Sequence, residues 1–403
     1  MQSYKGVRDF YPEDQRIQNY IFSAMRRAVE SFGYEEMNAS VLEPTELYLS
    51  KTSEEIVNEQ TYTFKDRGDR SVTLRPEMTP TVARMVAARR RELGFPLRWY
   101  SIQNFFRYEK PQRGRLREHW QLNTDLFGVS GVEAEIEIIS AAYQVMKELG
   151  ANDEMFSVRV NSRQLMQNLY QPLLKKGVEM AELFRLLDKK EKLNQKAFED
   201  ACGKLLNGPF QEASAQDNSA LSATLEALKE RGIKAVFDPS ILRGFDYYTD
   251  IVFEVFDTDP KNPRALFGGG RYDGLVEQYG GEQVPAIGFA MGDVTTRDFL
   301  ETHKLLPELH SPTHLYLAPV SEEYSEAASQ FANELRKKGI NVALGMKHEK
   351  IADHIKAATK LNIPYFAVYG PEEASSETLK VKNLKSGEEK KISFQKIAPS
   401  LLP

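Results

Sequence analysis

The first half of the chain alternates between amphipathic helices and short strands. Apolar residues recur at helical spacing over residues 13–32, which predicts a helix that ends at Gly33. The same reasoning predicts helices at 82–93 and 132–149, a strand at 36–42, and hairpins at 61–74 and 99–127. Antiparallel hairpins interleaved with helices are typical of an α+β fold rather than of a doubly wound parallel sheet.

The pattern changes twice in the second half. Residues 167–235 are charged and helix-rich, which indicates a helical insertion between two parts of one domain, 1–166 and 236–303. Residues 304–312 contain prolines without periodicity and predict a linker. Strands and helices then alternate as β-α-β-α-β, which predicts a small α/β domain over 313–403.

Composition and charge exclude several classes of protein. A net charge of −5 over 403 residues excludes a surface that is basic throughout, so any site for a polyanion is local. A single cysteine, Cys202, excludes an internal disulfide framework and favours a reducing compartment. We find neither the apolar core of a signal peptide nor an apolar run of membrane-spanning length, so we predict a cytoplasmic protein that does not contact a membrane.

Several familiar catalytic motifs do not occur in the sequence. There is no GxxxxGK[ST] phosphate loop, no HExxH metal motif and no GxSxG nucleophile elbow, and Gly268–Gly270 lacks the context of a dinucleotide fingerprint. With one cysteine, a structural zinc site is not expected either. Any catalysis would therefore depend on arginines, carboxylates and backbone groups.

The hairpin at 99–127 carries an unusual set of polar residues. Arg107 and Glu109 lie two apart on its first arm, and Gln121 and Asp125 share a face of the second arm. Such a surface is costly unless it binds a polar ligand or is open to water, and an exposed basic hairpin is the alternative interpretation.

Three more segments concentrate polar residues and glycine. They are LRPEMTP (74–80), ILRGFDYYTD (241–250) and GGGRYDGLVEQYGG (268–281). Together with the hairpin they supply arginines for anionic groups and carboxylates for an amine or a ring nitrogen. This combination suits a zwitterionic amino acid bound beside a nucleotide phosphate.

These segments resemble the histidyl-tRNA synthetases, a family of class II aminoacyl-tRNA synthetases. FRYEKPQRGRLREHWQLNTDLFG is similar to motif 2, RGFDYYT to the histidine-binding motif, and GGRYDGLVEQYGG with PAIGFAMG to the approach to motif 3. KIADHIKAATKLNIPYFAVYG and VKNLKSGE resemble the anticodon-binding domain. The resemblance implies an antiparallel class II sheet of six to seven strands with flanking helices, a helical insertion, a C-terminal α/β domain and a homodimer.

The resemblance also implies the site residues. The histidine-binding residues would be Glu77, Thr79, Gln121, Asp125, Arg243, Tyr247 and Tyr248. The first three would hold the α-amino group, Asp125 and Tyr248 the imidazole nitrogens, and Arg243 the carboxylate, while Tyr247 would shape the pocket. The ATP and tRNA residues would be Arg107, Glu109 and Arg115 for ATP, and Gln112 and Arg113 for the tRNA acceptor end. Mg²⁺ would accompany ATP, with no metal held by the protein alone.

The implied reaction has two steps. The histidine carboxylate attacks the α-phosphorus of ATP in line, while Arg107 and Arg243 stabilise the transferring phosphoryl group. The 3′-terminal ribose hydroxyl of tRNA(His) then attacks the adenylate. For specificity, Asp125 would accept the imidazole N–H and Tyr248 would serve the other nitrogen.

Two positions depart from the family pattern, and they leave alternatives open. Val294 and Thr295 stand where motif 3 has a glutamate and the arginine that stacks on adenine, and Arg297 is two residues away, about 200° around a helix. Ser40 stands at the motif 1 proline. One alternative is a histidine-sensing regulatory subunit of ATP phosphoribosyltransferase, which is a non-catalytic paralogue. Another is a tRNA- or nucleotide-binding scaffold that has lost catalysis.

Overall fold

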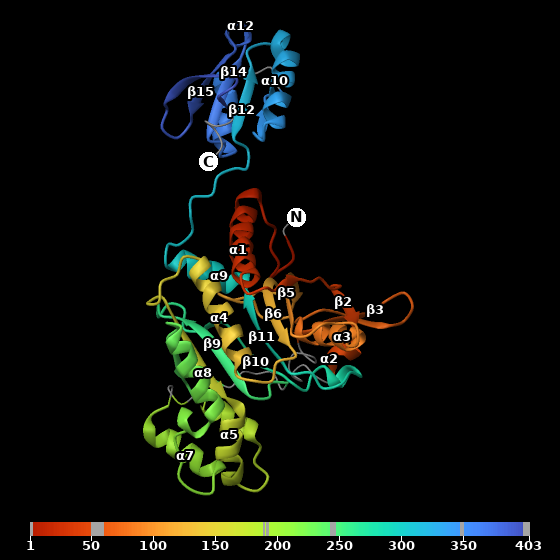
Figure 1. Ribbon diagram of the computed structural model, residues 1–403, viewed down its shortest axis with the longest axis vertical. Helices are drawn as coiled ribbons and strands as arrows, with labels where there is room; N and C mark the ends of the chain where they lie inside the picture. Colours follow the sequence, from red (N-terminus) through yellow and green to blue (C-terminus); the bar gives the residue numbers. More distant parts are fainter. Residues whose placement is uncertain are drawn as a thin grey trace. The chain divides into compact units, whose positions relative to one another are not determined.

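The computed structural model describes residues 3–49, 60–187, 190, 193–241, 247–346 and 350–397. The chain divides into two units, Met1–Leu306 and Pro307–Pro403, and each is described by itself (Figure 1). Within these described ranges, no helix combines the length and the apolar character needed to cross a membrane.

The first unit is built on a mixed sheet that has eight strands within the described residues, in the order β1-β5-β6-β11-β10-β9-β7-β8. In that order the strands are Glu35–Glu36, Leu97–Phe106, Glu118–Phe127, Ala286–Gly292, Ala265–Arg271, Ile251–Asp257, Phe156–Ser162 and Ala235–Phe237. The edge strand β1 pairs with β5 in parallel, and the other edge strand, β8, pairs with β7 in parallel. All other neighbouring strands pair antiparallel. The predicted α+β fold with a largely antiparallel class II-type sheet is confirmed. The implied number of six to seven strands is too low, because the short edge strands β1 and β8 extend the six antiparallel strands to eight in the described residues.

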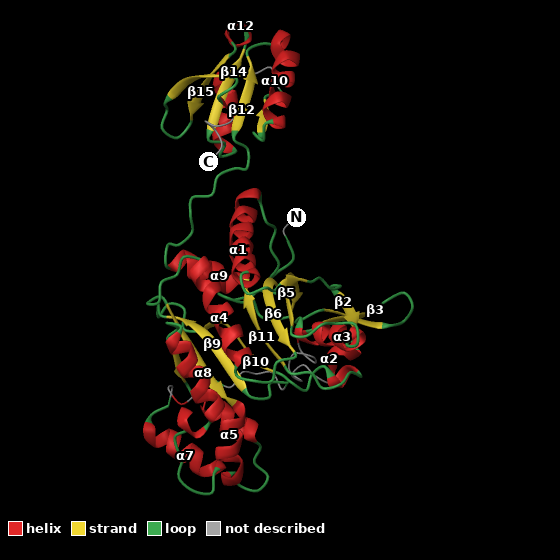
Figure 2. Ribbon diagram, in the orientation of Figure 1, coloured by secondary structure: helices red, strands yellow, loops and turns green. Residues whose placement is uncertain are grey.

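Four helices cover one face of this sheet (Figure 2). They are α1 (Pro12–Glu30), α4 (Glu133–Glu148), α8 (Ser219–Glu230) and α9 (Asp293–Thr302). Their apolar stripes share one core with inward-facing strand residues such as Leu122 and Phe253. A second core joins α3 (Thr79–Arg89) to the opposite face through Val82 and Tyr272, among others. Most of the polar residues singled out in the sequence lie on that opposite face.

The helical insertion has a small core of its own. It contains α5 (Arg163–Tyr170), α6 (Met180–Leu187) and α7 (Gln195–Leu205), whose buried residues include Tyr170, Phe198 and Cys202. Leu221 and Leu228 of α8 instead belong to the main core. The predicted insertion therefore divides between a separate helical cluster and a helix that covers the sheet.

A smaller sheet with order β2-β4-β3 contains Leu42–Pro44, Ser71–Leu74 and Tyr62–Lys65, and α2 (Glu46–Leu49) follows β2. The single strand predicted over 36–42 is wrong, because β1 ends at Glu36 in the large sheet and β2 begins in the small one. The carbonyls of Ala39 and Ser40 accept hydrogen bonds from Nη1 of Arg75, at 2.8 and 3.3 Å. These bonds occupy backbone groups that a continuous strand would pair.

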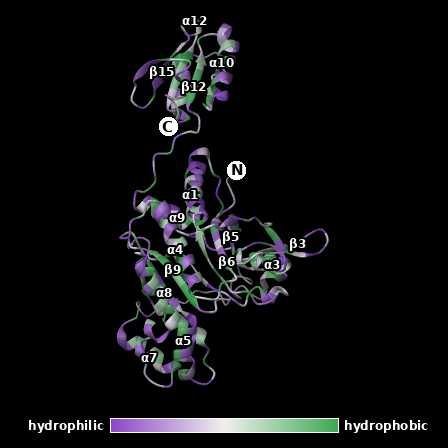
Figure 3. Ribbon diagram, in the orientation of Figure 1, coloured by the Kyte–Doolittle hydropathy of each residue, from purple (hydrophilic) through white to green (hydrophobic). Residues whose placement is uncertain are grey.

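The second unit is a five-stranded sheet in the described residues, with order β13-β12-β14-β15-β16. Its elements are β12 (Leu315–Pro319), α10 (Ser325–Lys337), β13 (Val342–Leu344), α11 (Ile351–Lys360), β14 (Tyr365–Tyr369), α12 (Pro371–Ser376), β15 (Thr378–Asn383) and β16 (Glu389–Ser393). Figure 3 shows hydrophobic residues along β12 and hydrophilic ones on the outer side of α10.

Short 3-10 helices occur in both units. They lie at Gln171–Leu173, Ala215–Asp217, Glu277–Tyr279 and Glu322–Tyr324.

Candidate functional site

The face of the large sheet turned away from α1 and α4 has a floor of glycine backbone. In the strand register, Gly288 of β11 lies between Asp125 of β6 and Gly270 of β10. Four residues further along β11, on the same face, Gly292 pairs with Gln121. Directly paired residues project to the same face of a sheet. The glycines have no side chain on that face, so they leave space between the polar side chains of the neighbouring strands.

This floor tolerates side chains at some positions only. A Cβ atom on Gly288 would lie 2.4 Å from Oδ1 of Asp125 and 2.6 Å from the carbonyl oxygen of Thr124. At Gly292 the nearest atom, Oγ1 of Thr295, is 3.8 Å away. We expect Gly288→Ala to lower the thermal unfolding midpoint by about 3–10 °C through overpacking, and Gly292→Ala to leave it nearly unchanged. Calorimetry of both variants measures the difference, and equal midpoints would contradict the close packing at Gly288.

Asp125 is the buried acid of this face. Its exposed fraction is 3%, and the Tyr272 hydroxyl donates a 2.5 Å hydrogen bond to its Oδ1. Among the described residues, Oδ2 has no hydrogen-bond partner. Burial raises the pKa of Asp125 to about 7, although the Tyr272 bond acts in the opposite direction. A buried carboxylate oxygen without a donor is suited to receive one from a ligand.

Two further tyrosines extend the aromatic group that begins at Tyr272. The Tyr248 ring lies over the floor, since a Cβ on Gly270 would lie 2.9 Å from its Cδ1. The Tyr247 ring centroid is 4.9 Å from that of Tyr248 and 6.0 Å from that of Tyr272. Burial raises the pKa values of Tyr247 and Tyr272 well above the ordinary range, so both hydroxyls keep their protons.

Tyr247 connects the aromatic group to the segment LRPEMTP. Its hydroxyl donates to Oε2 of Glu77 at 3.0 Å, and it also hydrogen-bonds Thr79 at the start of α3. Glu77 is buried, with an exposed fraction of 3%. A buried carboxylate next to a hydroxyl and a threonine can accept hydrogen bonds from an ammonium group.

Arginines attach this segment to β5. Arg75 is buried and structural: its Nε donates to the carbonyl oxygen of Asn104 at 2.9 Å. Arg107 follows the end of β5, and its Nε donates to the carbonyl oxygen of Pro76 at 2.8 Å. Arg107 is thereby held next to Glu77, although the two lie 30 residues apart by their numbers. The structure brings together a cation and the predicted amino-acid pocket.

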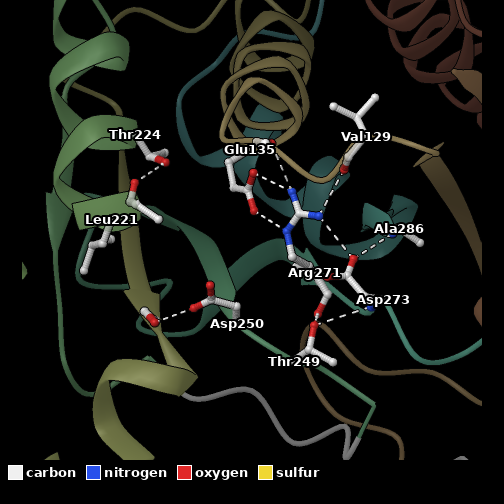
Figure 4. Close-up of polar contacts among 12 residues, drawn as sticks. Val129, Glu135, Leu221, Thr224, Thr249, Asp250, Arg271, Asp273 and Ala286 are labelled. Carbon is white, nitrogen blue, oxygen red and sulfur yellow. Dashed lines mark hydrogen bonds and ion pairs between the residues drawn. The ribbon is translucent and has the colours of Figure 1, made fainter. Parts of the chain in front are cut away.

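A buried ion cluster fixes the strand end that carries Tyr272 (Figure 4). Arg271 forms two bonds to Glu135 of α4, at 2.5 and 2.6 Å, and a 3.1 Å bond to Asp273. The carbonyl oxygen of Arg271 accepts a 2.8 Å hydrogen bond from the backbone N–H of Thr249. Thr249 directly follows Tyr247 and Tyr248 in the sequence. Successive residues of an extended chain point to opposite faces, so Arg271 and Asp273 point away from the face that carries Tyr272. The ion cluster therefore positions two segments, the one with Tyr272 and the one with Tyr247 and Tyr248.

The predicted nucleotide and tRNA residues other than Arg107 lie toward the hairpin tip. Glu109 pairs with Arg115 at 3.2 Å, and the backbone groups of Gln112 and Arg115 bond each other. Arg113 forms a two-nitrogen ion pair with Asp298 of α9, with a closest distance of 2.8 Å. Arg113 would have to leave this pair to bind a phosphate.

The start of α9 carries no cation at the motif 3 position. Asp293 accepts hydrogen bonds from Arg8 at 2.7 Å, from Gln18 at 2.9 Å and from the Trp120 backbone at 2.9 Å. Thr295 is bonded to backbone carbonyls. Arg297 pairs with Asp14 and Glu301, which agrees with the helical-angle argument that it does not replace the family arginine.

The structure gathers most of the predicted residues but not all of them. Arg243 lies outside the described residues, as does the neighbouring Asp246. Gln121 is half-buried on the glycine face, beside Gly292. Tyr272 was missed as a site residue; its position two residues after Gly270, on the same face, was the available signal.

Among the described residues, no three His, Cys, Asp or Glu side chains converge on a point where a metal ion could bind. Glu254 of β9 is half-buried and pairs with Gly268 on the glycine face. A single carboxylate fits a Mg²⁺ ion held mainly by nucleotide phosphates, because Mg²⁺ in such sites usually keeps only one or two protein carboxylates.

Comparisons with known proteins match both units of the chain. The family profile described as histidyl-tRNA synthetase matches residues 6–294, and an anticodon binding domain profile matches 314–402. The chain is 41% identical to a histidine–tRNA ligase of Leptospira biflexa, over 98% of this chain and 95% of that protein. It is 37% identical to the chloroplastic/mitochondrial histidine–tRNA ligase of Arabidopsis thaliana, over 96% and 83%. The apo crystal structure of the S. aureus histidyl-tRNA synthetase has the same fold, with a TM-score of 0.75, 23% identity and coverage of 100% and 99%.

Proposed function

The chain belongs to the histidyl-tRNA synthetase family, and from this premise we infer that it is a class II histidine–tRNA ligase. It uses ATP to convert L-histidine to histidyl-adenylate and then transfers the histidyl group to the 3′ end of tRNA(His). The observation that supports this inference most directly is Oδ2 of Asp125, a buried acceptor without a partner among the described residues, on a carboxylate that Tyr272 contacts.

Each described group has a role in this proposal. Oδ2 of Asp125 accepts the imidazole N–H, Tyr248 serves the other ring nitrogen, and Glu77 holds the α-ammonium group with Thr79 and Gln121. The substrate carboxylate oxygen forms a bond to the α-phosphorus, and the bond from that phosphorus to the pyrophosphate oxygen breaks. Arg107 balances the developing charge. Glu254 is the residue that would hold Mg²⁺, which when bound would neutralise charge on the pyrophosphate.

The test is histidine-dependent exchange of radioactive pyrophosphate into ATP by the purified protein without tRNA. A histidine–tRNA ligase catalyses this exchange, and a protein that only senses histidine does not. Absence of exchange under conditions where the protein is folded and binds histidine would overturn the proposal.

The second candidate, a regulatory subunit of ATP phosphoribosyltransferase, is less supported. The profile that matches residues 6–294 is described as histidyl-tRNA synthetase, and the Leptospira biflexa protein that is 41% identical over 98% of this chain is named a histidine–tRNA ligase. The same exchange assay separates the two, because only the ligase turns over ATP in response to histidine.

The raised pKa of Asp125 makes a pH dependence predictable. Its carboxylate accepts the imidazole N–H only when it is deprotonated, so the KM for histidine should rise as the pH falls below the pKa of about 7. Tyr272→Phe removes a donor that lowers this pKa, so the rise should begin at a higher pH. Titration of free histidine is the same for both proteins, so superimposable KM profiles would contradict the role of the Tyr272–Asp125 bond.

Removal of the second unit should separate the two steps. Leu305 and Leu306 pack on the main core, so truncation after Leu306 keeps that core complete. We expect pyrophosphate exchange to remain near the full-length rate and kcat/KM for tRNA charging to fall at least about 10-fold, because phosphate contacts are lost. Undiminished charging would contradict a tRNA-binding role for residues 307–403.

Two further properties are proposed from the family. We expect a homodimer, which sedimentation of the purified chain tests, and a cytoplasmic location, which fractionation of the source cells tests. A monomer active in pyrophosphate exchange would contradict the first expectation.

A further inference from the structure

The last two residues of β7 hold both ends of the segment ILRGFDYYTD (241–250). The side-chain N–H₂ group of Asn161 donates to the carbonyl oxygen of Ile241 at 2.9 Å. The next residue, Ser162, donates its hydroxyl hydrogen to Oδ1 of Asp250 at 2.5 Å. Two neighbouring residues therefore anchor this segment at its first and last positions.

The Ser162 hydroxyl also joins two helices. It caps α5, because its Oγ accepts from the backbone N–H of Leu165 at 3.0 Å. The same oxygen accepts a 3.1 Å bond from the side-chain N–H₂ of Asn218. Asn218 in turn caps α8, because its Oδ1 accepts from the backbone N–H of Leu221 at 2.9 Å. A hydroxyl has one hydrogen and two lone pairs, so Ser162 uses all three to connect Asp250 to the first turns of α5 and α8.

Asp250 is connected to the tyrosine pocket through the backbone. It lies two residues after Tyr248, whose ring lies over Gly270. Thr249, between them, donates to the carbonyl oxygen of Arg271 from its backbone N–H at 2.8 Å and from its hydroxyl at 3.3 Å (Figure 4). The segment is thus held by the ion cluster on one side and by the Ser162 hydroxyl on the other. With one residue between them, a displacement of the Asp250 anchor also shifts the Tyr248 ring.

Helix capping alone does not require the bond to Asp250. Asn194 caps α7 through a single 2.8 Å bond from the backbone N–H of Ala197. Ser162 makes the equivalent bond, but it also directs its hydrogen to a carboxyl group 88 residues away in the sequence. This extra bond joins the caps to a segment that belongs to the tyrosine pocket.

We propose that Asp250, Ser162 and Asn218 form a junction that couples histidine binding to α5 and α8, which begin and end the helical region between β7 and β8. Asp250 is a positioning residue, because it acts through Tyr248. A ligand that fixes the tyrosine also fixes Asp250, and this stabilises both caps. Coupling is reciprocal, so ordering of the two helices favours the arrangement that binds histidine. This inference rests on the proposed function, because it takes histidine as the ligand of the pocket.

Two variants of Asp250 test the positioning role. Asp250→Ala removes the acceptor of the Ser162 hydroxyl hydrogen, so it should raise the KM for histidine in pyrophosphate exchange about 3- to 10-fold, the loss expected for one hydrogen bond, with kcat nearly unchanged. Asp250→Asn keeps a carbonyl oxygen as acceptor and should remain close to wild type. Asn194→Ala is the matched control, because it removes a helix cap outside the junction and should leave the KM unchanged. An unchanged KM in Asp250→Ala would overturn the proposal.

Hydrogen exchange of two amides tests the coupling itself. The backbone N–H groups of Leu165 and Leu221 report on the caps, because their exchange requires the cap bonds to open. In the wild type, saturating histidine without ATP or tRNA should slow exchange of both amides about 3- to 10-fold, the same coupling seen from the other end. In Asp250→Ala, saturating histidine should leave both rates unchanged. Equal slowing in this variant and in the wild type, or no slowing in the wild type, would overturn the proposal.

Asn218→Asp separates the two arms of the junction. Aspartate still accepts from the Leu221 N–H and keeps the α8 cap, but its carboxylate cannot donate to Ser162. Histidine should then slow exchange at Leu165 and no longer at Leu221, and retained slowing at Leu221 would contradict the path through Ser162. These measurements require histidine binding but no turnover. A wild-type protein that shows the coupling without catalysing pyrophosphate exchange would overturn the proposed function and support the junction.

Discussion

Arg107→Ala is expected to lower the rate of histidine-dependent pyrophosphate exchange by about 100- to 1000-fold, the effect typical of removing one group that stabilises transition-state charge. The Pro76 carbonyl fixes the Arg107 guanidinium through a 2.8 Å bond to Nε, which orients it beside Glu77. The loss should appear mainly in kcat, because the charge on the transferring phosphoryl group develops only as the reaction proceeds.

Two variants make the Arg107 result interpretable. Arg107→Lys keeps a positive charge without the planar fork, and it should recover only part of the lost rate. Arg231→Ala is the control, because Arg231 is an exposed arginine bonded to the Ala227 carbonyl in α8. An exchange rate of Arg107→Ala within about threefold of wild type would show that this residue does not contact the reacting phosphate.

Asp125→Asn should affect histidine binding and protein stability in opposite directions. The amide replaces one acceptor oxygen by an N–H₂ donor, so one buried group loses its partner and the KM for histidine should rise about 10- to 100-fold. The folded-state pKa of about 7 is above the ordinary value of 3.8, so the charged form is disfavoured by folding. That penalty grows as the pH rises from 3.8 to about 7 and is complete above it.

The thermal midpoint at about pH 8 should therefore be higher for Asp125→Asn than for the wild type, and the difference should shrink on acidification through the pKa. Asp125→Ala is the comparison, because it also removes the charge but leaves a cavity and an unpaired Tyr272 hydroxyl. A lower midpoint for Asp125→Asn at alkaline pH would mean that the carboxylate stabilises the folded protein, contrary to the direction of its pKa.

The sequence was sufficient for the local elements and for the residues within motifs. Periodicity placed the first helix within two residues of α1, and alternation placed Gln121 and Asp125 on one face of β6. Sequence patterns did not predict contacts between side chains that lie far apart in the chain. The bond between Tyr272 and Asp125 joins residues 147 apart, and the pair of Arg113 with Asp298 spans 185.

The strand predicted over 36–42 failed for a related reason. Intrinsic strand propensity could not show that Arg75 would bind the carbonyls of Ala39 and Ser40 and divide the segment between two sheets. Motif resemblance supplied what periodicity could not, because it carries positional information about residues that meet only after the antiparallel strands have paired.

The glycine floor has a consequence for inhibitor design. A compound that lies flat on Gly270 and Gly288 contacts main-chain atoms, which a point mutation does not exchange. A target usually escapes an inhibitor by adding bulk beneath it, yet a methyl group on Gly288 would lie 2.4 Å from the Asp125 carboxylate, and one on Gly270 would lie 2.9 Å from the Tyr248 ring. Resistance through either glycine would damage recognition of the natural substrate, so chemistry directed at this floor should select few viable escape mutants.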